Sequence, residues 1–364
     1  MKQYLRLSGS TLVLAAILAL AACGEEKKEE QAAEQPAAPA TSTQTASTES
    51  APATDATQPA ATQEAAVAPA KLPESADPIK IANFDWTSGV LNTKIMETIL
   101  KQYGYNVEIV TADYLASLTA GIPTGDLTLG LEYWDTTANE AMAEADKTGK
   151  VERLGSLGPK AKEEWWYPAY MKEKCPGLPD WKALNDCAEA FSTPETSPKG
   201  RYLGGPVTWG GYDDERVEAL GLNYEVVHAG TDANMFAELE SAYQRKAPIL
   251  LWIYSPHWAV AKYEGEWVEF PEYTSECYND PAWGMNKDMA YDCGKPFGEI
   301  WKYAWAGMKD KWPVAHSIAK NYQFEAAEMN ALISQVDLDG KSLEEVAGAW
   351  VAANQDKIKK WAGQ

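Results

Sequence analysis

The sequence predicts an α/β protein with two lobes, a ligand cleft between them and a helical C-terminal tail. Strand-like and helix-like segments alternate over residues 79–134 and again over residues 202–254, which favours parallel strands joined by helices. The length supports two lobes, because residues 76–364 are about twice as long as a typical domain of ~150 residues. In such folds small ligands bind at the carboxyl ends of strands or between the lobes.

Three strands and two helices are expected in the first stretch. Large apolar residues recur at helical spacing after Thr87 or Ser88, each of which can cap a helix, until Gly104 ends the run. Gly121 stops a second, shorter helix. In order, we expect a strand at 79–84, a helix ending before 104, a strand at 107–110, a helix at 114–118, and a strand at 127–131 that runs into Trp134.

The second stretch repeats this pattern, and a long helical region follows it. The expected elements are strands at 202–207, 224–228 and 248–254 and helices at 213–220 and 233–245. The chain becomes irregular after Trp267, and from Pro296 to Trp361 we expect helices throughout. Trp301, Trp305 and Trp350 should then lie on the core-facing sides of those helices.

Residues 1–22 are typical of a signal peptide that is removed from the mature protein. Lys2 and Arg6 precede an apolar run from Thr11 to Leu20, which is too short to span a bilayer as a helix. The Leu-Ala-Ala-Cys sequence that ends at Cys23 resembles the bacterial lipobox, and this resemblance implies a lipidated Cys23 that anchors the protein to a membrane. The alternative is an ordinary signal peptide followed by an incidental cysteine.

The next segment, residues 23–76, is expected to be a disordered tether that begins with the lipidated cysteine. Ala, Thr, Gln, Glu, Pro and Ser dominate it, and Val67 and Leu72 are its only large apolar side chains. Its alanine content also allows transient helix. The folded part then divides into lobe I at 77–168, lobe II at 169–270, and a return to lobe I with the helical tail at 271–364.

The charge balance argues against nucleic acid as a partner. The 364 residues hold 32 Lys and Arg against 53 Asp and Glu, a formal net charge of -21, and no basic block is longer than a pair. An acidic protein suits a cationic ligand better. The sequence also lacks a G-x-S-x-G elbow, an H-E-x-x-H helix and a phosphate-binding glycine loop. We therefore expect no enzymatic activity and no cofactor.

Four cysteines remain after Cys23, and an even number in an exported protein implies disulfides. We favour the local pairs Cys175–Cys187 and Cys277–Cys293, because each closes a loop that contains Pro or Gly. A zinc site is the alternative, but no histidine lies near either cysteine pair in the sequence. Asn and Asp residues between 279 and 292 could gather oxygen ligands for calcium, yet the EF-hand order is absent and we predict no metal site.

Four aromatic residues stand where expected strands end. Trp86 follows the first strand, Trp134 ends the third, Trp209 follows the strand at 202–207, and Tyr254 ends the strand at 248–254. Because strand ends form the rim of a cleft in such folds, we expect these side chains to line a binding site. Trp and Tyr faces suit a trimethylammonium group, which is a cation that cannot donate hydrogen bonds.

Five motifs occur in a fixed order along the chain. They are Phe84-Asp85-Trp86-Thr87, Gly125-Asp126-Leu127 leading to Trp134, Trp166-Tyr167-Pro168-x-Tyr170, Gly205-Pro206-x-x-Trp209-Gly210, and Pro248-Ile249-Leu250 followed by Tyr254-Ser255-Pro256-His257-Trp258. With them the chain, over about residues 78–364, resembles the substrate-binding proteins of ABC importers for quaternary amines: glycine betaine, choline, carnitine and trimethylamine N-oxide. The resemblance implies a type II periplasmic-binding-protein fold that closes on a methylated amine, with an ABC permease as partner.

The resemblance also implies roles for individual residues. Trp134 and Trp209 match the cage tryptophans of the family, and Trp86 matches a first-strand tryptophan of some members. Betaine binders often carry Trp where this chain has Tyr254, so the fourth wall of the cage is undecided. The candidates for that wall are Tyr254, Trp252, Trp181 and Trp258.

The polar end of the ligand is less determined. A betaine carboxylate needs donors, which the amides of Gly210 and Gly211 or the ring of His257 can provide. An acidic group in the cage would instead favour choline or a protonated N-oxide. The disulfide loop around Cys175 resembles the trimethylamine N-oxide branch of the family more than the betaine branch. The acidic residues beside the expected cage are Glu132, Glu163 and Glu164.

The sequence therefore predicts a monomeric receptor, tethered at the periplasmic or cell-surface face of a membrane, that delivers a methylated amine to a permease. Which leaflet holds the lipid is open. A glycan-binding lipoprotein is one alternative, and its tryptophans would stack on sugar rings from a shallow, exposed platform. An enzyme on the same fold is the other, and it would convert the ligand.

Overall fold

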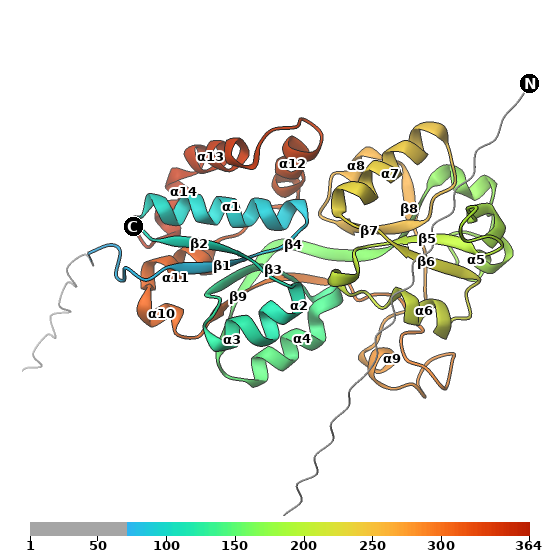
Figure 1. The fold of residues 1–364 in the computed structure, drawn as a ribbon, viewed down its shortest axis with the longest axis horizontal. Coiled ribbons are helices and arrows are strands. Elements are labelled where there is room, and N and C mark those ends of the chain that lie inside the picture. Colours follow the sequence, from blue (N-terminus) through green and yellow to red (C-terminus); the bar gives the residue numbers. More distant parts are fainter. Residues whose placement is uncertain (1–70) are drawn as a thin grey trace, which may run out of the picture. The chain divides into compact units, whose positions relative to one another are not determined.

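The structure of the protein is a computed structural model, and it describes residues 71–364. The predicted signal peptide, Cys23 and the tether up to residue 70 lie outside the described residues. The described part contains a nine-stranded mixed sheet with the order β2-β1-β3-β9-β4-β7-β5-β6, and β8 pairs with β4. Figure 1 shows two lobes, each with its own part of the sheet and helices packed against it. The predicted two-lobed α/β fold with a helical C-terminal end is confirmed.

Lobe I begins with three parallel strands, since β1 pairs with β2 on one side and β3 on the other. The elements expected before residue 135 are present, with bounds shifted by a few residues. In chain order they are β1 Ile79–Asn83, α1 Thr87–Gln102, β2 Val107–Thr111, α2 Tyr114–Ala116, α3 Ile122–Thr124 and β3 Leu129–Trp134, followed by α4 Asp135–Lys147.

Lobe II repeats this arrangement, because β5 lies between β6 and β7 and runs parallel to both. The strands and helices expected between residues 202 and 254 are present here. The elements of this lobe are α5 Ala183–Asp186, β5 Gly200–Gly204, α6 Asp213–Ala219, β6 Tyr224–His228, α7 Asp232–Arg245, β7 Leu251–Ser255, α8 Ala259–Lys262, β8 Gly265–Trp267 and α9 Ser275–Asn279.

A strand that the sequence analysis did not anticipate joins the two lobes. The first part of β4, Val151–Pro168, pairs with β9 of lobe I, and its second part pairs with β7 and β8 of lobe II. Its register shifts twice, and Gly158 lies there with a φ of +120°. A Cβ on Gly158 would lie 2.1 Å from the carbonyl oxygen of Phe324, so only glycine fits this close approach.

The prediction of helices throughout 296–361 is wrong for its first part. Residues Gly298–Trp305 form strand β9, which is antiparallel to both β3 and β4. Trp301 and Trp305 therefore lie on a strand and not on a helix, whereas Trp350 is buried on a helix as predicted. Aromatic residues alternate along β9, and this alternation favours a strand over a helix. The Arg153 guanidinium lies over the Trp301 ring, 4.7 Å from its centroid.

The helical tail packs on lobe I after β9. Lys302 of β9 is buried, and its ammonium group donates hydrogen bonds to the carbonyl oxygens of Ala319, Lys320 and Tyr322, which end one of these helices. In Figure 1, α12 and α13 lie beside α1. The tail consists of α10 Met308–Lys311, α11 Pro313–Asn321, α12 Ala326–Asp337, α13 Leu343–Ala353 and α14 Gln355–Trp361.

Both predicted disulfides are present. Cys175 is joined to Cys187 with 5.5 Å between their Cα atoms, and Cys277 to Cys293 with 6.3 Å. Within residues 71–364 no group of three or more His, Cys, Asp or Glu side chains is arranged to hold a metal ion. The segment before β9, predicted as part of the return to lobe I, lies against lobe II, where the Lys295 amide donates to Glu164 at 2.8 Å.

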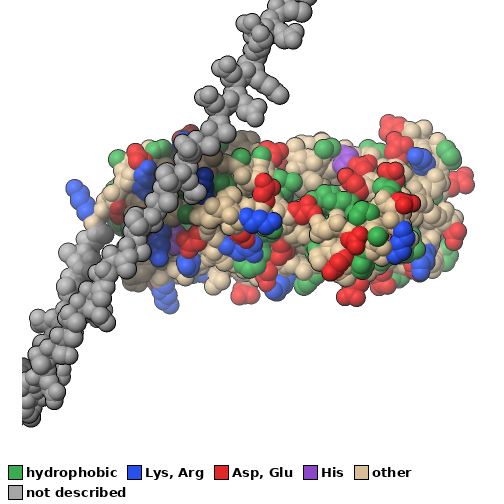
Figure 2. All heavy atoms as spheres, turned by 90° about the horizontal axis from the view of Figure 1, so that it is seen from below, with side chains coloured by type: hydrophobic (Ala, Val, Ile, Leu, Met, Phe, Trp, Pro, Cys, Tyr) green, Lys and Arg blue, Asp and Glu red, His purple; other side chains and the backbone are tan. Residues whose placement is uncertain are grey.

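On the part of the molecular face that stays visible beside the grey atoms in Figure 2, acidic and basic side chains are interspersed without a basic stripe. Over the described part of the chain, no helix has the length and apolar character needed to cross a membrane.

Candidate ligand-binding site

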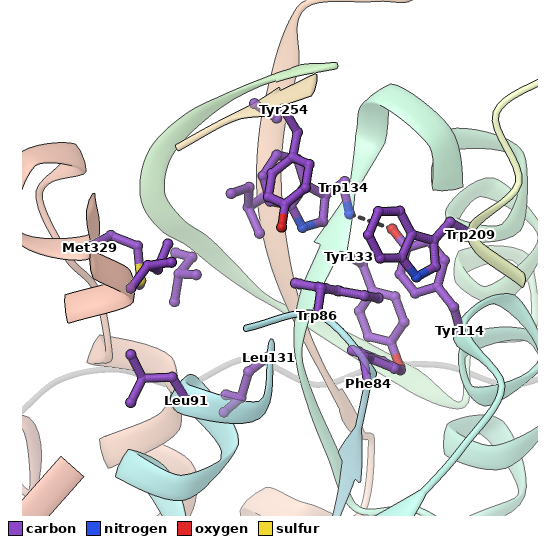
Figure 3. Close-up of a cluster of buried hydrophobic side chains, with 14 of the residues drawn as sticks. Phe84, Trp86, Leu91, Tyr114, Leu131, Tyr133, Trp134, Trp209, Tyr254 and Met329 are labelled. Atoms are coloured by element: carbon purple, nitrogen blue, oxygen red, sulfur yellow. Dashed lines mark hydrogen bonds between the residues drawn. The ribbon is translucent and has the colours of Figure 1, made fainter. Parts of the chain in front are cut away.

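An aromatic pocket lies where the two lobes meet. The volume between its lining side chains is about 280 Å³, and this value includes the space at the open side of the pocket. Figure 3 shows aromatic rings converging on this space from several elements of the two lobes. We refer to the pocket as the cage, and its lining consists of Trp86, Tyr114, Trp134, Thr137, Glu163, Trp209 and Tyr254.

The ends of strands place the rings of the cage. Trp86 follows β1 at the start of α1, and Trp134 ends β3 immediately before α4. Trp209 closes a short turn after β5, and Tyr254 lies near the end of β7. The structure thus brings together the four aromatic residues that the sequence analysis selected for standing at strand ends.

The rings meet at nearly right angles, as the walls of a box do. The Trp86 and Trp209 centroids are 5.7 Å apart at 80°, and those of Trp134 and Tyr254 are 5.6 Å apart at 82°. Trp209 and Tyr254, both from lobe II, are 6.0 Å apart at 80°. Edge-to-face contacts of this kind stabilise aromatic clusters.

Acidic residues outside the cage lining hold the polar atoms of these rings. Trp86 Nε1 and Trp134 Nε1 both donate to Glu132 Oε2, at 2.6 and 3.4 Å. Trp209 Nε1 donates across the cleft to Asp85 Oδ1 at 2.7 Å. Because the indole N–H groups are already used, a ligand in the cage meets mainly ring faces, and such faces attract cations.

Glu132 supports the cage without lining it. Ser88 and Asn92 donate to its carboxylate in addition to the two indoles. Burial raises the pKa of Glu132, while these hydrogen bonds act in the opposite direction. Tyr254 is held in a similar way, because its hydroxyl donates to Asp232 Oδ1 at 2.9 Å.

Glu163 of β4 is the one carboxyl group among the lining residues described above. Thr136 donates a hydrogen bond to it from the start of α4. Burial raises the pKa of Glu163 to about 7, although the charge of Lys295 and the threonine hydroxyls oppose this rise. Near neutral pH the group can therefore exist as a carboxylic acid that donates a hydrogen bond, or as a carboxylate that accepts one.

Two lining residues were missed by the sequence analysis. Tyr114 begins the short helix after β2, so the rule that selected the other aromatic residues would also have selected it. Its hydroxyl accepts a hydrogen bond from the Trp134 amide at 2.8 Å, drawn dashed in Figure 3. Thr137 lies in the first turn of α4, a helix that the sequence analysis did not predict, and no sequence signal pointed to it.

Two of the other predicted site residues support the cage region from behind. Trp252 packs against Trp209 at 6.3 Å, and the Lys295 ammonium lies 4.2 Å from its ring centroid. Glu164 forms a buried ion pair with Arg216 at 2.6 Å. Neighbouring residues of a strand face opposite sides, which is why Glu163 reaches the cage and Glu164 does not.

The remaining candidates lie elsewhere. Trp181 lies within the loop closed by the Cys175–Cys187 disulfide, where its amide donates to the Glu269 carbonyl at 3.2 Å. His257 stacks on Phe236 with centroids 3.8 Å apart, and Trp258 donates to Asp337. Each of these residues is buried, but none of the three lines the cage.

Residues 77–353 match the model of the family described as substrate binding domain of ABC-type glycine betaine transport system. The chain belongs to this family. It is therefore a substrate-binding protein of ABC-type quaternary amine transport and not an enzyme, and it works outside the cytoplasm with an ABC permease.

Individual relatives agree with this assignment. The chain is 32% identical over 293 residues to a trimethylamine N-oxide-binding protein of Pelagibacter ubique (strain HTCC1062), a match covering 78% of this chain and 90% of that protein. An ABC-transporter choline binding protein in complex with choline has a TM-score of 0.62 at 20% identity, covering 80% of this chain and 93% of that one. Lactococcal OpuAC complexed with glycine betaine has a TM-score of 0.59 at 18% identity, and the match covers 78% of this chain and 99% of that one. The two structures support the fold.

The glycan-binding alternative finds no support. It requires tryptophans on a shallow, exposed platform. Trp86, Trp134 and Trp209 are instead only 5%, 4% and 6% exposed, within a pocket between the lobes.

Proposed function

We propose that this protein is anchored at Cys23 by lipid and captures a trimethylammonium compound in the cage, in the first place trimethylamine N-oxide, for delivery to the permease. The observation that carries this proposal is the lining itself: aromatic rings on several sides and a single buried carboxyl group, Glu163. Ring faces bind the methylated nitrogen, and Glu163 is available to the polar end of the ligand.

The charge of the lining favours an N-oxide over a zwitterion with a carboxylate. Among the described residues, no Lys, Arg or His side chain lines the cage, so a ligand carboxylate would find no cationic partner there. It would face Glu163 instead, and an unpaired carboxylate in a buried pocket is costly. Glycine betaine and carnitine should therefore bind more weakly than the N-oxide.

Choline is the closer competitor, because it carries a hydroxyl group in place of a carboxylate. Its hydroxyl can donate to ionised Glu163, whereas the N-oxide oxygen can only accept and needs protonated Glu163. The pKa of Glu163, raised by burial to about 7, keeps much of the group protonated near neutral pH. The similarity to the Pelagibacter protein, named for trimethylamine N-oxide, supports the same choice.

Calorimetric titration with trimethylamine N-oxide, choline, glycine betaine, carnitine and a neutral carbon isostere of choline tests the ligand. We expect the N-oxide to bind most tightly, with a micromolar or lower Kd, and the isostere to give no heat, because a neutral tert-butyl group lacks the attraction to ring faces. Tightest binding of glycine betaine, or silence from all five compounds, would contradict the proposal.

A further inference from the structure

A second group of contacts joins the two lobes outside the cage. Figure 1 shows α12 of lobe I close to α7 and α8 of lobe II. Five side chains meet there, and none of them lines the cage. We call this group the interlobe cluster, and it consists of Thr87 and Asp337 from lobe I and Asp232, His257 and Trp258 from lobe II.

Asp337 receives donors from both lobes. Trp258 Nε1 donates across the cleft to Asp337 Oδ2 at 2.6 Å, and Thr87 Oγ1 donates to Oδ1 at 2.8 Å. His257 Nδ1 accepts from the Ala259 amide, so in the neutral ring Nε2 carries the proton, and this atom lies 3.6 Å from Asp337 Oδ2. Asp337 thus has most of its partners in the opposite lobe.

The position of Asp337 makes these partners important. It is the last residue of α12, where the helix dipole is negative and a carboxylate is unfavourable. Burial would raise the pKa of Asp337, but the nearby His257 ring and the hydrogen bonds from Trp258 and Thr87 lower it overall. The donors of lobe II therefore stabilise the negative charge of Asp337, which the dipole of α12 disfavours. They do so only while the lobes are closed.

Asp232 connects the same contact to the cage. Its Oδ2 accepts the backbone N–H of Thr87 at 3.2 Å, at the positive end of α1 in the opposite lobe. Its Oδ1 accepts the hydroxyl of Tyr254, which is a wall of the cage. One buried carboxylate therefore contacts both the lobe interface and a wall of the binding site.

We propose that Asp232 and Asp337 are positioning residues that hold the lobes closed over a bound ligand without touching it. Opening the cleft breaks the Asp337–Trp258 and Asp232–Thr87 hydrogen bonds. Closing by hinge motion restores them after the ligand has entered. The cluster should therefore slow ligand release and leave ligand capture unchanged.

Two substitutions weaken one hydrogen bond from opposite sides. Trp258→Phe keeps an aromatic ring but loses the Nε1 donor, and Asp337→Asn keeps the size but replaces the charged acceptor by a neutral amide oxygen. We expect each to raise the dissociation rate of trimethylamine N-oxide about tenfold in stopped-flow fluorescence, as for a hydrogen bond to a charged group, with an unchanged association rate. The double variant should release ligand more slowly than the product of the two single effects would give, because both changes act on the same bond.

Asp339→Asn is the matched control. It removes the same charge two residues further on, where the exposed carboxylate lies 3.9 Å from Lys341 and forms no hydrogen bond or ion pair with the described residues of lobe II. This variant should bind and release ligand as the parent protein does. Equal dissociation rates for Asp337→Asn and Asp339→Asn, or a loss that appears in the association rate, would overturn the inference.

Small-angle scattering provides a second readout, taken at a saturating concentration of whichever of the five titrated compounds binds the parent protein. Under these conditions the Trp258→Phe and Asp337→Asn proteins should be more open than the parent, with a larger radius of gyration, while their thermal unfolding midpoints stay close to that of Asp339→Asn. A parent protein that does not bind the N-oxide refutes the ligand assignment alone. Identical scattering curves for variants and parent refute the interlobe cluster.

Discussion

Replacing Trp134 by alanine should weaken the binding of trimethylamine N-oxide by about 1 kcal/mol or more, because one face of the cage is lost. This loss corresponds to a roughly fivefold or greater increase in Kd. Trp209→Ala should have a larger effect, since Trp209 also donates to Asp85 across the cleft. Calorimetric titration of both variants provides the measurement.

Two controls separate the loss of a cage wall from general damage. Trp134→Phe keeps a ring face and should recover much of the affinity. Trp283→Ala removes a tryptophan from the loop between Cys277 and Cys293, where 36% of the side chain is exposed, and should leave the affinity unchanged. Unchanged affinity in both Trp134→Ala and Trp209→Ala would contradict the cage.

The affinity for trimethylamine N-oxide should fall as the pH rises through about 7, because the protonated form of Glu163 supplies the hydrogen bond to the N-oxide oxygen. Choline should show the opposite trend, since its hydroxyl donates to the ionised form. Titrations at several pH values between about 6 and 8.5 measure both trends. Glu163→Gln should bind the N-oxide with an affinity that does not change over this range.

The same carboxyl group should affect stability. The pKa of Glu163 is raised in the folded protein to about 7, so its contribution to stability is complete below the unfolded pKa of about 4.3 and is lost as the pH rises to 7. In that interval the folded state holds a proton that the unfolded chain has released. Glu163→Gln should therefore show a smaller decrease in unfolding free energy between pH 4.5 and 7.

An N-oxide affinity of the parent protein that is independent of pH would contradict the role assigned to Glu163 in ligand binding.

The aromatic part of the site could be predicted because it depends on local order along the chain. Trp86 and Trp134 each stand at the junction of a strand and a helix, and parallel strands bring such junctions to one edge of a sheet. Trp209 and Tyr254 occupy similar places in the other lobe. The positions of these four residues follow from strand boundaries, which apolar patterning indicates with an error of only a few residues.

The acidic part could not be resolved in the same way. Whether Glu163 or Glu164 faces the cage depends on the register of β4, and that strand was not anticipated. Its glycines and its two register shifts interrupt the alternation that would have marked it. The strand β9 was predicted as a helix for a related reason. Its short run carries apolar residues at spacings that a helix can also use.

The interlobe cluster depends on contacts between residues far apart in the chain. Thr87 and Asp337 are separated by 250 residues, and no pattern in either segment indicates that they meet. His257 and Trp258 were selected from the sequence as candidate ligand contacts. The structure places them in this cluster, where the centroid of the His257 ring lies 4.8 Å from that of the cage wall Tyr254, and Asp232 accepts the Tyr254 hydroxyl.

A crystal structure of the protein with trimethylamine N-oxide would test the central claim most directly. We predict the three methyl groups against the faces of Trp86, Trp134, Trp209 and Tyr254, and the N-oxide oxygen within hydrogen-bond distance of Glu163. A ligand bound outside this cage, or inside it with its oxygen directed away from Glu163, would contradict the account.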